Sequence, residues 1–162
     1  MGIKIPLALG AASLILGLVL LCLLIHSPHA GNPRHLASRE EHGLRFVLTV
    51  EEATGDGGWS LRIHLLVENV GEEAMAVWFR SGQAWDIVVE ADGQEIWRWS
   101  QGKMFTQVIW SRELRPGEEV SFEAEWEAPG PGKYRIRGYF LGHIGGLDGP
   151  SLEPLDILVQ VG

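Results

Sequence analysis

The chain has 162 residues, of which 21 are acidic and 13 are basic, so its formal net charge is −8. Every acidic residue lies at or after Glu40, and an acidic domain repels phosphate, which excludes nucleic acid as an expected partner. The single cysteine, Cys22, excludes a disulfide within the chain and a cysteine metal site. Any folded domain must therefore rely on its hydrophobic core.

The chain opens with an apolar segment. After a four-residue tail (1–4), residues 5–25 form a run of 21 amino acids without a charge, and about 20 apolar residues are enough for a helix to span a bilayer. We expect one N-terminal transmembrane helix that stays attached, because a cleaved signal usually has a shorter apolar region of about 7–15 residues. The short tail favours an internal N-terminus, which would make this a single-pass cell-membrane protein with an extracytoplasmic domain.

Residues 26–42 are predicted to be a polar tether. This stretch contains proline, glycine, asparagine and four of the six histidines, but almost no large apolar residue. Such a composition buries too little apolar surface to offset the conformational entropy lost on ordering.

Residues 43–162 are predicted to be one all-β domain. Apolar residues recur at every second position, and Gly, Pro, Asn and Asp interrupt the pattern about every ten residues, which is typical of a sandwich or barrel. The alternation is clearest over 59–69, which predicts one buried face and one wetter face. The expected strands are 44–52, 59–69, 75–79, 84–91, 94–100, 106–113, 118–127, 133–141 and 155–161.

The two strands around Asp92-Gly93 allow two pairing registers. A two-residue loop would place Glu90 opposite Glu95, and like charges directly across a ladder destabilise a sheet. A three-residue loop with a glycine bulge gives different cross-strand pairs: Trp85–Trp99, Ile87–Trp97 and Asp86–Arg98. We predict this second register, with the tryptophans of both strands on one face and an exposed ion pair between Asp86 and Arg98.

No set of residues in the domain has the pattern of a catalytic or metal site. His64 lies on the polar side of a predicted strand, and His143 lies in a glycine-rich connection without metal-ligand spacing. Ser81 and Ser100 lack an elbow motif and an evident base. The seven tryptophans favour an enlarged core over a sugar- or protein-binding platform, because five fit apolar strand positions. We therefore expect no catalytic residue, no metal and no small-molecule cofactor.

Several motifs occur in a distinctive order. A Ser-Gly-Gln-Ala-Trp-Asp element at 81–86 is followed by Trp-Arg-Trp-Ser-Gln-Gly-Lys-Met-Phe at 97–105. The other elements, in chain order, are Val67-Glu68-Asn69, Leu114-Arg115-Pro116-Gly117-Glu118, Trp126 and Gly132-Lys133-Tyr134. With these motifs the chain resembles the intracellular proteinase inhibitor (BsuPI) domain family of bacteria, roughly from Leu44 to Tyr139.

The resemblance implies an immunoglobulin-like antiparallel β-sandwich and, from the founding member of the family, inhibition of subtilisin-type serine proteases. We accordingly expect a membrane-anchored, inhibitor-like domain whose partner is a protein such as a serine protease. The alternative is a non-inhibitory adhesion or assembly module that binds a cell-envelope protein or glycan.

The residues themselves offer one candidate partner contact, which is the connection after the Trp-x-Trp strand. Its members are Ser100, Gln101, Lys103 and Met104. Lys103 and Met104 are the side chains long enough to enter a protease pocket. The alternative for this segment is a plain link between two strands.

Overall fold

The computed structural model describes residues 34–55 and 58–162. These residues form eleven strands and no helix, and every strand pairing among them is antiparallel, which confirms the all-β prediction. The strands are β1 (Arg34–Glu41), β2 (Leu44–Gly55), β3 (Gly58–Asn69), β4 (Met75–Phe79), β5 (Trp85–Ala91), β6 (Gln94–Arg98), β7 (Trp110–Leu114), β8 (Glu119–Ala128), β9 (Gly132–Phe140), β10 (His143–Ile144) and β11 (Leu155–Val161).

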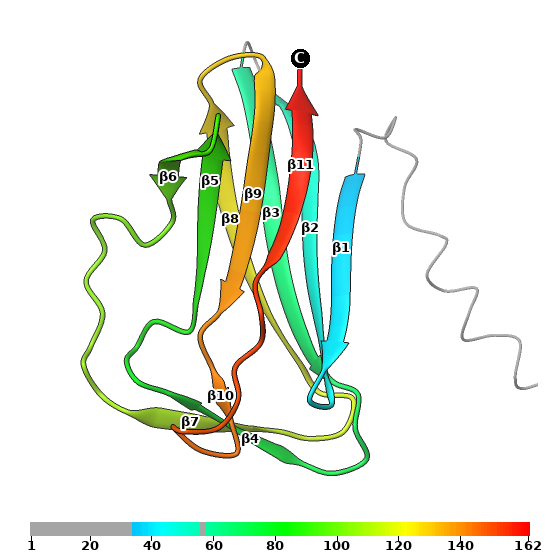
Figure 1. The fold of residues 1–162 in the computed structure, drawn as a ribbon, viewed down its shortest axis with the longest axis vertical. Helices are drawn as coiled ribbons and strands as arrows, with labels where there is room; N and C mark the ends of the chain where they lie inside the picture. Colours follow the sequence, from blue (N-terminus) through cyan, green and yellow to red (C-terminus); the bar gives the residue numbers. More distant parts are fainter. Residues whose placement is uncertain (1–33, 56–57) are drawn as a thin grey trace, which may run out of the picture. The chain divides into compact units, whose positions relative to one another are not determined.

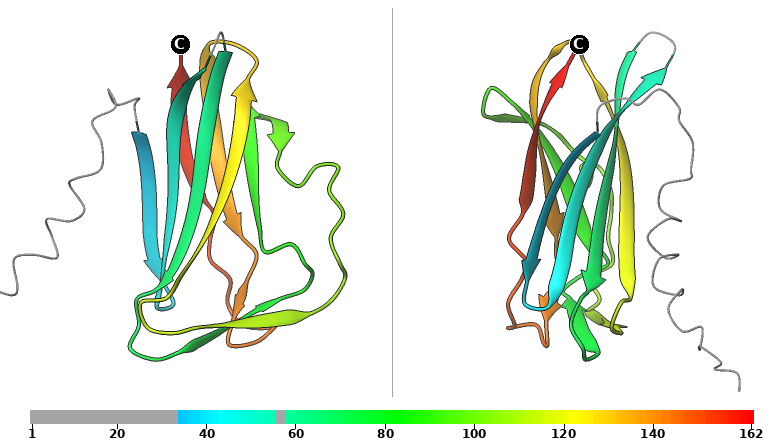
Figure 2. Two further views of the ribbon diagram at one scale, coloured as in Figure 1. Left: turned by 180° about the vertical axis from the view of Figure 1, so that it is seen from behind. Right: turned by 90° about the vertical axis from the view of Figure 1, so that its right-hand side faces the viewer.

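Two four-stranded sheets form the layers of a β-sandwich (Figures 1 and 2). One sheet has the strand order β1-β2-β3-β8, and the other has the order β11-β9-β5-β6. A third sheet, β10-β4-β7, lies at one end of the sandwich. The connection from β6 to β7 therefore has to travel from the edge of one layer to the end of the domain.

The core lies between the two layers, and the two-residue alternation explains its composition. In β3, Leu61, Ile63 and Leu65 point inward and are fully buried, while the polar residues between them face outward. Full burial of one such side chain contributes about 1.5–3 kcal/mol. Five tryptophans are buried in this core or pack against it: Trp85, Trp97, Trp99, Trp110 and Trp126. Trp59, which alternation placed on the buried face of β3, is 41% exposed.

The predicted tether is wrong over Arg34–Glu41, because these residues form β1 and pair with β2 along their full length. His42 and Gly43 make the turn between the strands with φ values of 53° and 79°, as a two-residue hairpin turn requires. β1 is a mostly exposed edge strand. Only Ala37 of this strand packs against the core. β1 is therefore held mainly by the backbone ladder and by cross-strand pairs such as Arg34–Glu51 at 3.3 Å.

The predicted membrane anchor at 5–25 lies outside the described residues, as do the tail at 1–4 and the first part of the tether, 26–33. Within the part that is described, no helix is long and apolar enough to cross a bilayer. The predictions of an anchor and of its orientation therefore stay predictions.

The predicted register of the β5–β6 hairpin is wrong. The loop has two residues, Asp92 and Gly93, with φ values of 52° and 77°. Ala91 lies opposite Gln94 next to the loop, and Glu90 lies opposite Glu95 in the pair after it. A bulge then shifts the ladder, so that Trp97 lies opposite Val89 instead of Ile87. Because strand positions alternate, Trp97 still shares the face that carries Trp85.

The two glutamates are tolerated across the ladder because each has its own arginine. Glu90 pairs with Arg137 of β9 at 3.2 Å, and Glu95 pairs with Arg98 at 2.6 Å. The like-charge argument against this register failed because it considered only the two paired strands.

Gly138 of β9 provides a test of how closely the two layers pack. A Cβ at this position would lie 2.5 Å from Leu65 Cδ2 and 3.3 Å from Leu48 Cδ1 of the opposite sheet. Gly138→Ala should therefore lower the free energy of unfolding by about 1–3 kcal/mol, measured by urea unfolding of the full chain with tryptophan fluorescence.

The matched control is Gly146→Ala, because a Cβ at Gly146 would meet no atom within 4 Å. Its effect should stay below about 0.5 kcal/mol. Equal stabilities for the two variants would contradict the close packing at Gly138.

Candidate functional site

The β6–β7 connection, residues 99–109, is the longest stretch between named strands in the described part of the chain. It leaves the edge of the β11-β9-β5-β6 sheet and runs along the outside of the domain to β7 (Figure 1). It contains the candidate contact predicted from the sequence. Two anchors, one near each end, determine its path.

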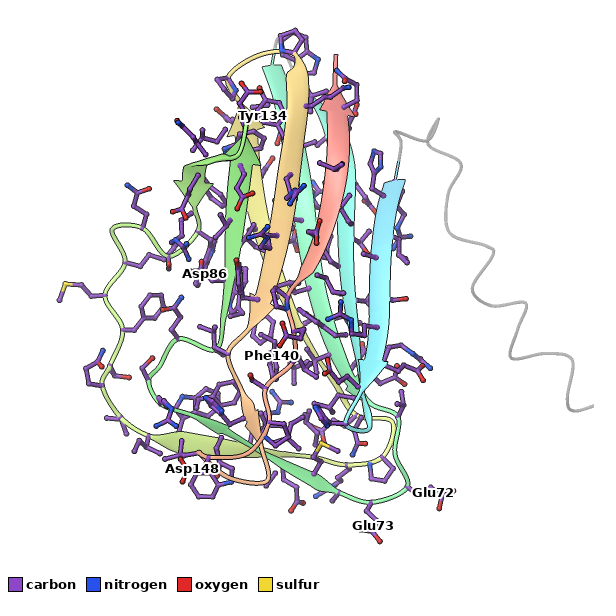
Figure 3. All side chains as sticks on the ribbon, in the orientation of Figure 1. Glu72, Glu73, Asp86, Tyr134, Phe140 and Asp148 are labelled. Carbon is purple, nitrogen blue, oxygen red and sulfur yellow. The ribbon has the colours of Figure 1, made fainter. Side chains whose placement is uncertain are left out.

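Asp86 of β5 is the first anchor (Figure 3). It is only 4% exposed, and its carboxylate accepts hydrogen bonds from the Ser100 hydroxyl at 2.6 Å and the Ser100 N–H at 3.1 Å. The Arg98 guanidinium donates a third bond at 3.0 Å, and the Ile87 N–H donates a fourth at 3.0 Å. A buried carboxylate is stable only when it is paired and hydrogen-bonded in this way.

Arg98 ties this anchor to the protein surface. Its guanidinium binds both oxygens of Glu95, at 2.9 and 2.6 Å, while also donating to Asp86. The hydrogen bond to Glu95 is the main cause of a raised pKa for Arg98, and the same bond lowers the pKa of Glu95. The predicted Asp86–Arg98 pair therefore exists, but it is not exposed as predicted, because its carboxylate is buried.

Aromatic rings support the start of the connection. Trp99 packs on Trp85 with ring centroids 3.9 Å apart, and Trp85 in turn stacks on Phe122 of β8 at 5.3 Å. Phe105 lies 5.9 Å from Trp99, and the Lys103 ammonium sits 4.4 Å above the Trp99 ring. These contacts hold residues on both sides of the intervening Met104.

The second anchor joins the connection to the segment between β4 and β5. The Gly82 N–H donates to the Thr106 carbonyl at 2.8 Å, and the Trp110 indole N–H donates to the Ser81 carbonyl at 2.7 Å. A Cβ at Gly82 would lie 2.6 Å from Thr106 Oγ1. A larger residue at this position would therefore press on the Thr106 side chain, which glycine avoids.

Three large apolar side chains of the connection point into solvent. Met104 is 98% exposed, Val108 is 62% exposed and Ile109 is 54% exposed. Exposed apolar side chains on an anchored segment are a feature of protein-binding surfaces.

The four predicted contact residues have different surroundings. Ser100 is held inside the Asp86 anchor, so it positions the connection. Gln101 lies in the turn that follows, where its N–H donates to the Arg98 carbonyl at 3.1 Å. Lys103 is exposed but lies over Trp99, whereas Met104 is free of the domain surface.

Sequence reasoning missed the exposure of Val108 and Ile109, because both were placed in an expected strand at 106–113. The strand β7 begins only at Trp110. Two adjacent residues of a strand point to opposite faces of the sheet, so Val108 and Ile109 could not both face the core. This break in the alternation was the available signal that the strand begins later.

The remaining motifs have a structural role. Asn69, which is fully buried, donates to the Leu114 carbonyl and to the Glu73 carbonyl, both at 2.8 Å. The Gly117 N–H donates to the Asn69 carbonyl at 2.8 Å. Asn69 thus holds the turn after β3 against the turn between β7 and β8.

Elsewhere in the described chain, the candidates for a chemical site are metal-ligand groups and hollows. The described residues contain no group of three or more His, Cys, Asp and Glu side chains that could hold a metal. An apolar cavity of about 60 Å³ lies beside Phe79, Trp110 and Phe140, far smaller than the roughly 300–1,000 Å³ of most ligand sites. A larger surface hollow of about 380 Å³ lies on the β1-β2-β3-β8 sheet and is lined by residues that include Leu36, Val47 and His64.

Comparison with known proteins gives one family. The sequence model of BsuPI, described as "Intracellular proteinase inhibitor", matches residues 46–144, and no curated protein matches the chain. A similar solved structure is described as the crystal structure of the "Putative ApaA Protein from Bordetella pertussis", at 17% sequence identity and a TM-score of 0.45. The alignment covers 81% of this chain and 97% of that one.

The Asp86 anchor predicts a large effect of a small substitution. Asp86→Asn keeps the shape of the side chain but removes the negative charge that faces Arg98. It also places an amide NH₂ group, which donates hydrogen bonds, against partners that are themselves donors. The free energy of unfolding should fall by about 2–4 kcal/mol, and limited proteolysis within 99–109 should become faster.

Asp92→Asn is the control, because Asp92 lies in an exposed turn where asparagine is equally suited to a positive φ. Its unfolding curve should match that of the unchanged chain within about 0.5 kcal/mol. If Asp86→Asn behaved in the same way, the carboxylate would not be the anchor described here.

Proposed function

The chain belongs to the intracellular proteinase inhibitor (BsuPI) family, and on that premise we propose that its β-domain inhibits a subtilisin-type serine protease through the β6–β7 connection. Inhibition of proteases is the activity by which the family is described. The protease class, the contact surface and the immunoglobulin-like classification of the sandwich are part of the proposal.

The observation that carries the proposal is the combination of exposure and anchoring in one segment. Met104, Val108 and Ile109 are exposed, while bonds to Asp86 and Gly82 hold the backbone before and between them. A binding segment that is ordered before association loses less conformational entropy on binding. Protease–inhibitor pairs owe much of their affinity to such preorganisation.

The connection also has the chemistry expected of the centre of a protein interface. Three of its exposed side chains are large and apolar, and its lysine lies over an aromatic ring. Apolar and aromatic anchors carry most of the binding free energy in protein interfaces. The turn after Asn69 differs, because its exposed residues include the charged side chains of Glu72 and Glu73.

A membrane location is a second part of the proposal. The 21 uncharged residues at 5–25 have the length of a bilayer span, and an extracytoplasmic domain is part of this proposal. The full chain is expected in the membrane fraction of cells. Protease added to the outside of spheroplasts should digest its β-domain. Recovery in the soluble fraction would contradict the anchor without affecting the inhibitory activity.

Inhibition is tested by titrating a subtilisin-type protease with the full chain in detergent. Turnover of a peptide substrate should fall in proportion to the amount of chain added. Val108→Asp should weaken inhibition about tenfold, because it puts a charge into an apolar contact.

Leu158→Asp is the matched control, since Leu158 of β11 is 65% exposed, close to the 62% of Val108. β11 and β6 are opposite edges of the same sheet, so this variant should inhibit like the unchanged chain. Unchanged turnover with an excess of intact chain would overturn the proposal. An equal loss of inhibition in Val108→Asp and Leu158→Asp would mean that the β6–β7 connection is not the specific contact surface.

A further inference from the structure

Lys103 and Met104 are adjacent long side chains in the β6–β7 connection, and they differ in their contacts with the domain. The Lys103 ammonium lies 4.4 Å from the centre of the Trp99 ring. A cation over an aromatic face is stabilised by about 0.5–1 kcal/mol at an exposed site. Insertion of Lys103 into another protein would first have to break this contact.

Met104 has no such contact with its own domain. It is 98% exposed, the largest exposed fraction of any large apolar side chain in the described residues. Among those residues, its backbone N–H and carbonyl have no hydrogen-bond partner. Both the side chain and the peptide groups of Met104 are therefore available to a partner.

The residues on either side of Met104 are fixed. The Lys103 N–H donates to the Ser100 carbonyl at 3.0 Å, and Ser100 is bound to Asp86. Phe105 packs near Trp99, and the next carbonyl, that of Thr106, accepts from Gly82. An exposed residue between fixed neighbours is presented in one conformation, which is how a segment binds an extended substrate groove with little loss of entropy.

From this arrangement, and resting on the proposed function, we propose that Met104 is the side chain that enters the primary specificity pocket of the target protease. The pocket must then be apolar and deep enough for an unbranched side chain. Methionine is flexible and polarizable, so it fills elongated apolar pockets well. A pocket built for lysine or arginine would be left with an unpaired buried carboxylate and would reject it.

The test measures the inhibition constants of full-chain variants against two proteases, subtilisin with an apolar pocket and trypsin with an acidic one. Met104→Ala should weaken inhibition of subtilisin about 30-fold or more, as expected for a side chain at the centre of an interface. Met104→Lys should weaken inhibition of subtilisin and produce inhibition of trypsin. Lys103→Ala should change either constant by less than about fivefold.

The outcomes separate this inference from the proposed function. If the unchanged chain inhibits subtilisin and Met104→Ala inhibits within about threefold of it, the contact residue is wrong while the inhibitory function stands. A larger effect of Lys103→Ala than of Met104→Ala would likewise overturn the assignment. If the unchanged chain inhibits neither protease, both the inference and the function beneath it fail.

Discussion

The buried carboxylate of Asp86 is the interaction on which the exposed face of this domain depends. A charge in the protein interior requires both a countercharge and hydrogen-bond donors, and one short segment supplies them. The guanidinium of Arg98 comes from the end of β6, and the hydroxyl and N–H of Ser100 come from the turn that follows. The hydrogen bonds to this one carboxylate therefore fix the position at which the β6–β7 connection begins.

The same geometry explains why two distant sequence motifs contain matched pairs of residues. Trp85 and Asp86 are adjacent in β5, and Trp99 and Ser100 are adjacent after β6. The two tryptophans pack ring against ring, while the aspartate and the serine bond to each other. An apolar contact and a polar contact thus hold the same two backbones together at neighbouring positions.

Period-two alternation was enough to predict most of the fold. It placed β4 and β11 with their observed bounds and identified the buried face of β3. It missed β1, because an edge strand held mainly by its ladder has almost no apolar face to detect. In the candidate site, alternation predicted the tryptophan cluster, but the register required knowledge of Arg137 on a third strand and of a bulge. Such long-range information is not contained in the pattern of two neighbouring strands.

The β6–β7 connection is held without any covalent cross-link, since the single cysteine of the chain is Cys22. Small domains that display long loops outside the cell often hold them with disulfides, and their geometry then changes when thiols are reduced. Here a carboxylate, a guanidinium and stacked rings take that place. The path of the connection therefore does not depend on the formation or reduction of a disulfide. One and the same domain can keep its shape in a reducing cytoplasm and in an oxidising space beyond the membrane.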